Sequence, residues 1–236
     1  MNGPLVITLD TTPALAAQLA QLQIAFAEVC NAIAPVVQET RCWNRVALHH
    51  IVYRNLRERF PQLGSQLVCN AIYSVSRTCR IVFQSPGSPF SVNRQPERPL
   101  PQLKFAATAP VYFDRHTLSI RDGVVSMVTL DGRIRFRLSI SAADEQRFRE
   151  EKLREIVLSC QGGRYQLGFT FAAQNDKADM ADEMTAQSIL PEYVVLLESG
   201  HATRCAGDNA GSTTGNNADH ATDHSTPQET ALGDAP

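Results

Sequence analysis

The chain has 236 residues, of which 43% are hydrophobic and 19% are charged. These proportions are typical of a soluble globular protein, and the length suits one large domain or two small ones. No run comes near the roughly eighteen apolar residues that a membrane span needs, and no basic group precedes the short apolar stretch at the start. We therefore expect a cytoplasmic protein without membrane contact or signal peptide.

The formal net charge of −2 hides a strong asymmetry along the chain. Residues 1–172 carry 20 Lys and Arg against 13 Asp and Glu, a net of +7, whereas residues 173–236 carry 2 against 11, a net of −9. Of the 22 basic residues 19 are arginine, whose planar guanidinium binds phosphate through paired hydrogen bonds. This asymmetry indicates a nucleic-acid-binding body with a solvated acidic tail; a plain solvated basic face is the alternative.

Helical patterns fill the first third of the chain. Thr12 and Pro13 suit the N-cap and first position of a helix, and apolar residues then recur at spacings of three and four. Pro35 should end or kink this helix. Further helices are expected over about 44–60 and from about residue 65 to 83.

Two pairs of arginines lie on the second and third expected helices. Arg54 and Arg57 are three residues apart, as are Arg77 and Arg80, so the members of each pair should lie together on a helix surface. The segment that follows, 84–99, is rich in proline and serine and is expected to be an extended loop or linker.

Beyond residue 100 the apolar period changes to two, which predicts strands. Asp122-Gly123 and Asp131-Gly132 separate alternating runs, and Asp-Gly in such a place is a strong hairpin signal. A short charged helix is expected over 142–153, followed by another hairpin that turns at residues 161–164.

The sharpest motif is the run from Arg133 to Leu138, in which arginine alternates with apolar residues. On a strand, this alternation places Arg133, Arg135 and Arg137 on one face. Three cations in a row repel one another unless an anion neutralises them, and a phosphate backbone would do so. The alternative is an outer strand whose arginines discourage aggregation.

The sequence offers little for catalysis or for metal binding. Its six cysteines include no Cys-x-x-Cys pair, so free and mostly buried thiols are expected rather than a zinc site. His49 and His50 are neighbours, which is not metal-ligand spacing, and the spacing of His220 and His224 is attributed to chance. There is no Gly-rich phosphate loop or nucleophile elbow. We therefore expect no catalytic residue, no metal and no cofactor.

Several segments together resemble the N-terminal half of the TnpB (OrfB) proteins of insertion sequences, which are RNA-guided nucleases related to type V CRISPR effectors. The resemblance covers about residues 4–171, and its motifs are individually loose but stand in the expected order. They are Leu48–Leu63, Ser65–Val75, Pro110–Asp114, Leu118–Ile120 and Leu130–Ile134.

In that family the helices form a recognition lobe and a β-barrel forms a wedge. The resemblance implies an α+β fold, in which an antiparallel wedge-like barrel carries an inserted helical bundle. From composition we further expect an acidic tail that is largely disordered, with one apolar patch at Tyr193–Leu197. The corresponding segments are 1–11 and 100–172 for the barrel, 12–83 for the insert, 84–99 for the linker and 173–236 for the tail.

The resemblance also implies partners and contact residues. Guide-like RNA, double-stranded DNA or both would be bound without a cofactor. The implied contacts are Arg54, Arg57, Arg77, Arg80, Arg133, Arg135 and Arg137.

The chain departs from the family after the strand expected to end at Phe171. The family continues there into a RuvC-like nuclease domain that opens with Gly-x-Asp-x-Gly and is followed by a zinc ribbon, whereas residues 172–176 here read Ala-Ala-Gln-Asn-Asp. No catalytic carboxylate carries over, so we expect nucleic-acid binding without cleavage. The alternatives are a decayed transposon remnant, the recognition subunit of a nuclease split between two chains, and a protein-interaction module whose acidic tail covers the basic body.

Overall fold

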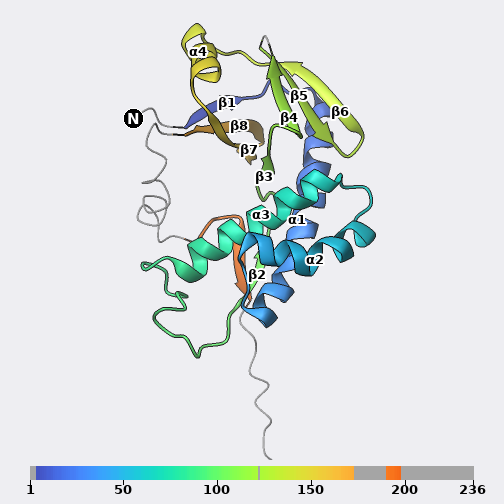
Figure 1. Ribbon diagram of the computed structural model, residues 1–236. Coiled ribbons are helices and arrows are strands. Elements are labelled where there is room, and N and C mark those ends of the chain that lie inside the picture. Colours follow the sequence, from blue (N-terminus) through green and yellow to red (C-terminus); the bar gives the residue numbers. More distant parts are fainter. Residues whose placement is uncertain (1–3, 122, 173–189, 198–236) are drawn as a thin grey trace, which may run out of the picture. The chain divides into compact units, whose positions relative to one another are not determined.

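The computed structural model describes residues 4–121, 123–172 and 190–197, which combine four α-helices with antiparallel sheets (Figure 1). The helices are α1 (Pro13–Thr40), α2 (Arg45–Arg59), α3 (Ser65–Cys79) and α4 (Ala142–Glu150), and a π-helical turn, η1 (Arg80–Gln84), extends α3. The strands are β1 (Leu5–Thr8), β2 (Gln102–Phe105), β3 (Val111–Phe113), β4 (Leu118–Arg121), β5 (Val124–Thr129), β6 (Gly132–Arg137), β7 (Leu153–Gln161), β8 (Arg164–Phe171) and β9 (Val194–Leu197).

The helix starts are those that the sequence predicts. The Thr12 hydroxyl accepts a hydrogen bond from the Leu15 N–H at 3.2 Å, with proline at the first helical position. Asn44 caps α2 in the same way by accepting from the N–H groups of Val46 and Ala47. Each cap satisfies backbone donors that the first helical turn leaves without a partner.

We expected Pro35 to end or kink the first helix. Pro35 does not end it, because α1 continues to Thr40. A proline inside a helix removes one backbone hydrogen bond. Ile33, Ala34 and Val37 are all buried around this position, and tertiary packing of that kind supplies most of the stability of a helix in a protein.

Among the described residues, α1 is the one helix long and apolar enough to cross a membrane by length and composition, with a mean hydropathy of 1.3 over its window. It packs against α3, β2 and β3, and residues such as Leu22, Phe26 and Val29 are fully buried in the core. The described part of the chain is compatible with a soluble protein.

Three separate sheets hold the strands. The largest has the order β1-β8-β7-β3, another has the order β4-β5-β6, and β2 pairs with β9. The two predicted Asp-Gly hairpins are confirmed by the pairs Arg121–Val124 and Thr129–Gly132. Gly132 has a φ of 106°, a backbone conformation that residues with a Cβ rarely adopt.

The predicted mixture of helices and antiparallel strands is confirmed, but none of the sheets in the described residues closes into the predicted barrel. The largest sheet ends at β3, which is only three residues long. Both α1 and α3 pack against β3. β3 is therefore an edge strand that contacts both helices.

The apolar patch within the expected tail forms a strand. Residues 173–189 and 198–236 lie outside the described residues, but Val194–Leu197 forms β9 and pairs with β2. Of the segment expected to be a linker, Gln84 ends η1, and residues 85–99 form turns without a regular strand or helix. The Val92 N–H in this segment donates to the Phe83 carbonyl of η1. Ser88 in this segment is buried and donates its hydroxyl to the Val82 carbonyl.

Candidate nucleic-acid interface

The three arginines of β6 lie on one face of the three-stranded sheet, as the sequence predicts. Their side chains are exposed, whereas Ile134 and Phe136 between them are half-buried and pack against the core. The alternation arises because successive side chains of a strand point to opposite faces.

The strand register adds a fourth arginine to this face. Arg137 lies opposite Val124, and Val124 lies opposite Arg121 on β4. Directly paired residues of antiparallel strands project on the same side, so Arg121 projects with the β6 arginines. We call the four residues Arg121, Arg133, Arg135 and Arg137 the arginine face.

No acidic residue occupies a strand position on the arginine face. Its other strand positions are Ser119, Val124, Ser126 and Val128, and none of the four arginines forms an ion pair with a described acidic residue. Side chains two apart on a strand lie about 7 Å apart, so each neighbouring pair repels by about 0.6 kcal/mol in water. A polyanion on this face would relieve that repulsion.

Arg133 is held in place by the neighbouring backbone. One of its terminal nitrogens donates to the carbonyl and the hydroxyl of Ser126 at 3.2 and 3.1 Å, and the other donates to the His116 carbonyl at 2.5 Å. These bonds hold one guanidinium along the sheet, and a side chain held in this way would lose less entropy if an anion bound to it.

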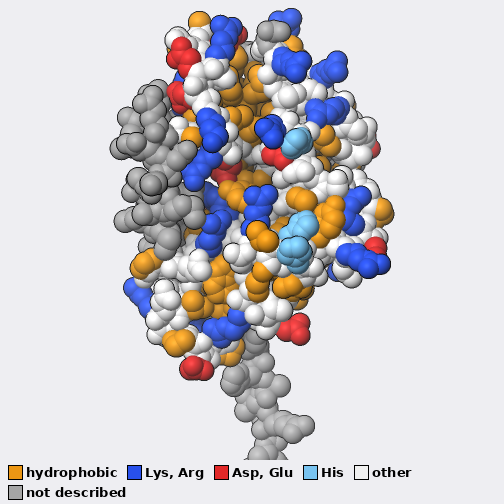
Figure 2. Space-filling model, viewed as in Figure 1, with side chains coloured by type: hydrophobic (Ala, Val, Ile, Leu, Met, Phe, Trp, Pro, Cys, Tyr) orange, Lys and Arg blue, Asp and Glu red, His pale blue; other side chains and the backbone are white. Residues whose placement is uncertain are grey.

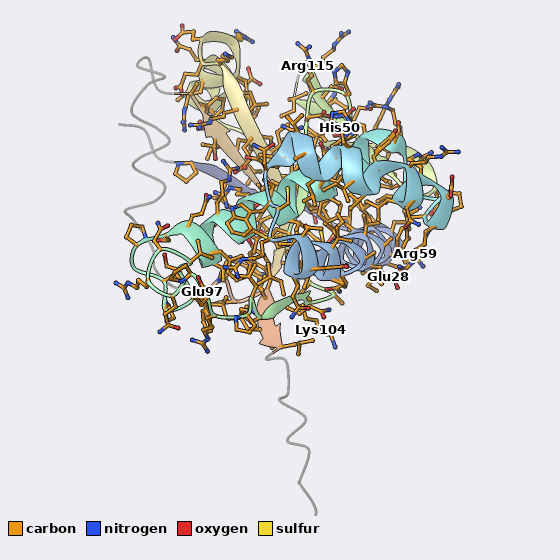
Figure 3. The ribbon with its side chains drawn as sticks, turned by 60° about the horizontal axis from the view of Figure 1, so that its bottom comes forward. Glu28, His50, Arg59, Glu97, Lys104 and Arg115 are labelled. Carbon is orange, nitrogen blue, oxygen red and sulfur yellow. The ribbon has the colours of Figure 1, made fainter. Side chains whose placement is uncertain are left out.

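The surrounding surface is also rich in cations. Figure 2 shows Lys and Arg side chains gathered over the upper sheets and along the middle of the molecule, with fewer acidic groups between them. In Figure 3, Arg115 lies at the top of the view above His50 on α2, while Glu97 and Lys104 lie at the opposite end. Arg115 is exposed in the turn that leads into β4.

The predicted pair on α2 has two different environments. Arg54 has a side chain that is 95% exposed and forms an ion pair with Glu58 at 3.4 Å, one turn along the helix. Arg57 is half-buried and donates to the Leu63 carbonyl, so it stabilises the turn between α2 and α3. Only Arg54 is presented to solvent as the sequence analysis expects.

The members of the second predicted pair, Arg77 and Arg80, also have different contacts. Arg77 forms an ion pair with Glu155 on β7 at 3.5 Å and donates to the Tyr112 hydroxyl at 3.5 Å, which links α3 to the largest sheet. Arg80 begins η1 and lines a cleft instead. The two side chains therefore have different surroundings, Arg77 against the sheet and Arg80 at the cleft.

Two cysteines are buried, and three are half-buried, among the five that the structure describes; Cys205 lies outside those residues. All five are free thiols, as predicted, although most are not fully buried. Burial raises the pKa of both Cys30 and Cys79 far above the usual value, and burial also raises the pKa of the Tyr112 hydroxyl. The described residues contain no group of three or more His, Cys, Asp and Glu side chains that could hold a metal ion.

Sequence reasoning missed Arg121, and only the pairing of β4 with β5 reveals its position. The two-residue turn after Arg121 is the signal that could have found it, because such a turn fixes the register of the whole hairpin.

No protein-family model matches the chain, and no curated protein matches its sequence. The resemblance to TnpB proteins stays a prediction from the sequence.

Proposed function

We propose that the chain binds nucleic acid through phosphate contacts at the arginine face and does not cleave what it binds. The observation that carries the proposal is the set of four exposed arginines on one sheet surface, on which the described strand positions hold no acidic side chain. Residues 1–172, which carry this face, have a net charge of +7 from 20 basic and 13 acidic residues.

Because the side chains of the arginine face are guanidiniums, we expect them to contact the phosphate backbone of the ligand and not its bases. Guanidiniums on a sheet surface offer paired hydrogen bonds to phosphate oxygens, and such contacts carry no sequence information. Guide-like RNA and duplex DNA both present the required row of phosphates, and the proposal extends to either. A role as the RNA-binding and DNA-binding region of a TnpB-like protein is the form of this function that the sequence resemblance favours.

Fluorescence anisotropy with labelled duplex DNA and structured RNA at several salt concentrations tests the proposal. Replacing Arg133, Arg135 and Arg137 by alanine should weaken binding and lower the log–log salt slope by about 2 to 3 on a duplex, because each phosphate contact releases about 0.9 counterion.

The matched control removes three exposed arginines elsewhere, by Arg59→Ala, Arg149→Ala and Arg164→Ala. This control changes the net charge equally and should largely keep the slope. Equal losses in the two triple variants, or no binding by the parent chain, would overturn the proposal. The second result would favour a remnant without activity.

A further inference from the structure

A cleft of about 730 Å³ beside the first turn of α2 is lined by four arginines, and no acidic residue of the described part of the chain lines it. The arginines are Arg41, Arg45, Arg80 and Arg154. None of them belongs to the arginine face, so the cleft is a separate cationic site.

The four arginines come from distant parts of the chain, and local backbone irregularities place three of them. Arg41 closes α1 with a φ of 52°, the left-handed conformation that glycine usually supplies. Arg80 begins the π-helical turn, and Arg154 falls at the register shift between Leu153 and Glu155 in β7. Left-handed residues, π-turns and bulges are each enriched at functional sites, and here all three converge on one cleft.

The fourth arginine, Arg45, lies at a helix N-terminus, where the helix dipole disfavours a cation. Arg45 is the first residue of α2, whose first turn has no acidic residue. The positive end of the helix dipole lies at this terminus and favours an anion. Neither Arg45 nor Arg80 forms an ion pair with a described acidic residue. The charges of Arg45 and Arg80 are therefore available to an anionic ligand, whereas the Arg41 guanidinium donates to the Pro96 and Arg98 carbonyls.

Aromatic side chains line the same cleft. Trp43 is half-buried and packs on Phe83 with ring centroids 5.6 Å apart, and the Arg45 guanidinium lies 5.1 Å from the centre of the Tyr73 ring. An inorganic phosphate would fill only a small part of the volume, whereas a cleft of this size accommodates a small organic ligand. A planar base can stack on an aromatic ring or on a guanidinium plane.

We propose that this cleft binds a nucleoside phosphate. The arginines would bind the phosphate group, and the part of the cleft lined by Trp43 and Tyr73 would contact the base. The ligand chemistry has two possible sources, a free mononucleotide or one nucleotide of a single strand. The site goes beyond the arginine face and does not depend on it.

The chain contains a single tryptophan, so the fluorescence of Trp43 reports directly on the cleft. Titrations of the full chain with adenosine monophosphate, oligoadenylate, adenosine and inorganic phosphate separate the possibilities. Quenching by the mononucleotide supports a free nucleotide, and quenching by oligoadenylate alone supports a strand. No quenching by either, or binding of adenosine or inorganic phosphate as tight as that of the mononucleotide, would overturn the proposal.

The variant Arg45→Gln/Arg80→Gln should weaken the binding of the quenching ligand by about tenfold or more, because it removes two hydrogen-bonding cations. Arg59→Gln/Arg164→Gln, which alters exposed residues outside the cleft, is the charge-matched control and should bind as the parent does. Circular dichroism checks the folding of both variants, and Arg45→Lys/Arg80→Lys, which keeps the charges, should restore part of the affinity. Equal weakening in the glutamine variant and its control would contradict the assignment.

The arginine-face variant separates this proposal from the proposed function. Replacing Arg133, Arg135 and Arg137 by alanine should leave the Trp43 response intact even where duplex binding is lost. A Trp43 response lost in that variant would contradict a separate site.

Discussion

The side-chain amide of Asn31 on α1 binds both backbone polar groups of Phe105 on β2. Its nitrogen donates to the Phe105 carbonyl at 3.0 Å, and its oxygen accepts from the Phe105 N–H at 2.7 Å. β2 pairs with β9 along its length, and Asn31 provides these two bonds in place of a further strand. One side chain thus joins the central helix to a short two-stranded sheet.

Asn31→Ala should lower the free energy of unfolding by about 1 to 3 kcal/mol, because it leaves partly buried backbone groups without these bonds. Asn31→Asp keeps the acceptor but cannot donate to the carbonyl when ionised, so it should destabilise at neutral pH and recover part of the loss in acid. Urea unfolding at two pH values measures both effects. Stability within experimental error of the parent in both variants would show that water replaces the amide.

Glu155 joins α3 to the largest sheet through two side chains of the helix. It accepts from the Tyr73 hydroxyl at 2.9 Å and pairs with Arg77 at 3.5 Å, with side-chain exposures of 14% for Glu155 and 22% for Arg77. Glu155→Gln keeps an acceptor for Tyr73 and removes the ion pair, so we expect a loss of about 1 to 2 kcal/mol. Tyr73→Phe should cost about 1 kcal/mol.

A double-mutant cycle of Glu155→Gln with Arg77→Gln isolates this pair. A coupling energy of at least about 0.5 kcal/mol is expected for residues in direct contact. Additive losses would mean that the pair contributes nothing beyond its separate parts.

Because Cys30 and Cys79 are buried thiols, we expect the free energy of unfolding to decrease at alkaline pH. Burial raises the pKa of Cys30 and Cys79 in the folded protein above the ordinary value of 9.0. The contribution of the two thiols to the free energy of unfolding is therefore fully present below pH 9. It decreases at higher pH, where these thiols ionise in the unfolded chain but stay protonated in the folded protein. The decrease approaches about 1.4 kcal/mol per pH unit for each thiol.

Unfolding free energies measured from pH 6 to pH 11 test this prediction. Cys30→Ala/Cys79→Ala should reduce the alkaline slope, even though the lost packing lowers stability at every pH. Between pH 6 and pH 8 the two proteins should have parallel profiles. An alkaline slope as steep in the double variant as in the parent would exclude these thiols as its source.

The position of β9 determines where the acidic end of the chain can be removed. A truncation after Leu197 keeps β9 and removes residues 198–236, which carry six Asp and Glu and one Arg, a net of −5. This variant should melt as the parent does and bind nucleic acid more tightly, because the removed charge repels phosphate. A truncation from residue 173 also removes the partner of β2, so its melting temperature should fall. Unchanged affinity after the shorter truncation would exclude shielding by the acidic end.

The sequence by itself determined the local elements. The helix cap at Thr12, the helix start near Asn44, the two Asp-Gly turns and the alternation in β6 depend on neighbours within a few residues. Each therefore follows from pattern alone. The exposed arginine row follows for the same reason. The acidic end was also evident from composition.

Only the tertiary structure decided how the elements combine and which arginines remain available. The strands form three open sheets in the described residues, which α1 and α3 contact at β3. The partners of Arg57 and Arg77, which are Leu63 and Glu155, lie outside the helix that carries each arginine, so helical periodicity does not reveal them. The cleft likewise brings together Arg41 and Arg154, which are separated by more than a hundred residues. Contacts between distant segments depend on how whole elements pack, and a short pattern does not encode them.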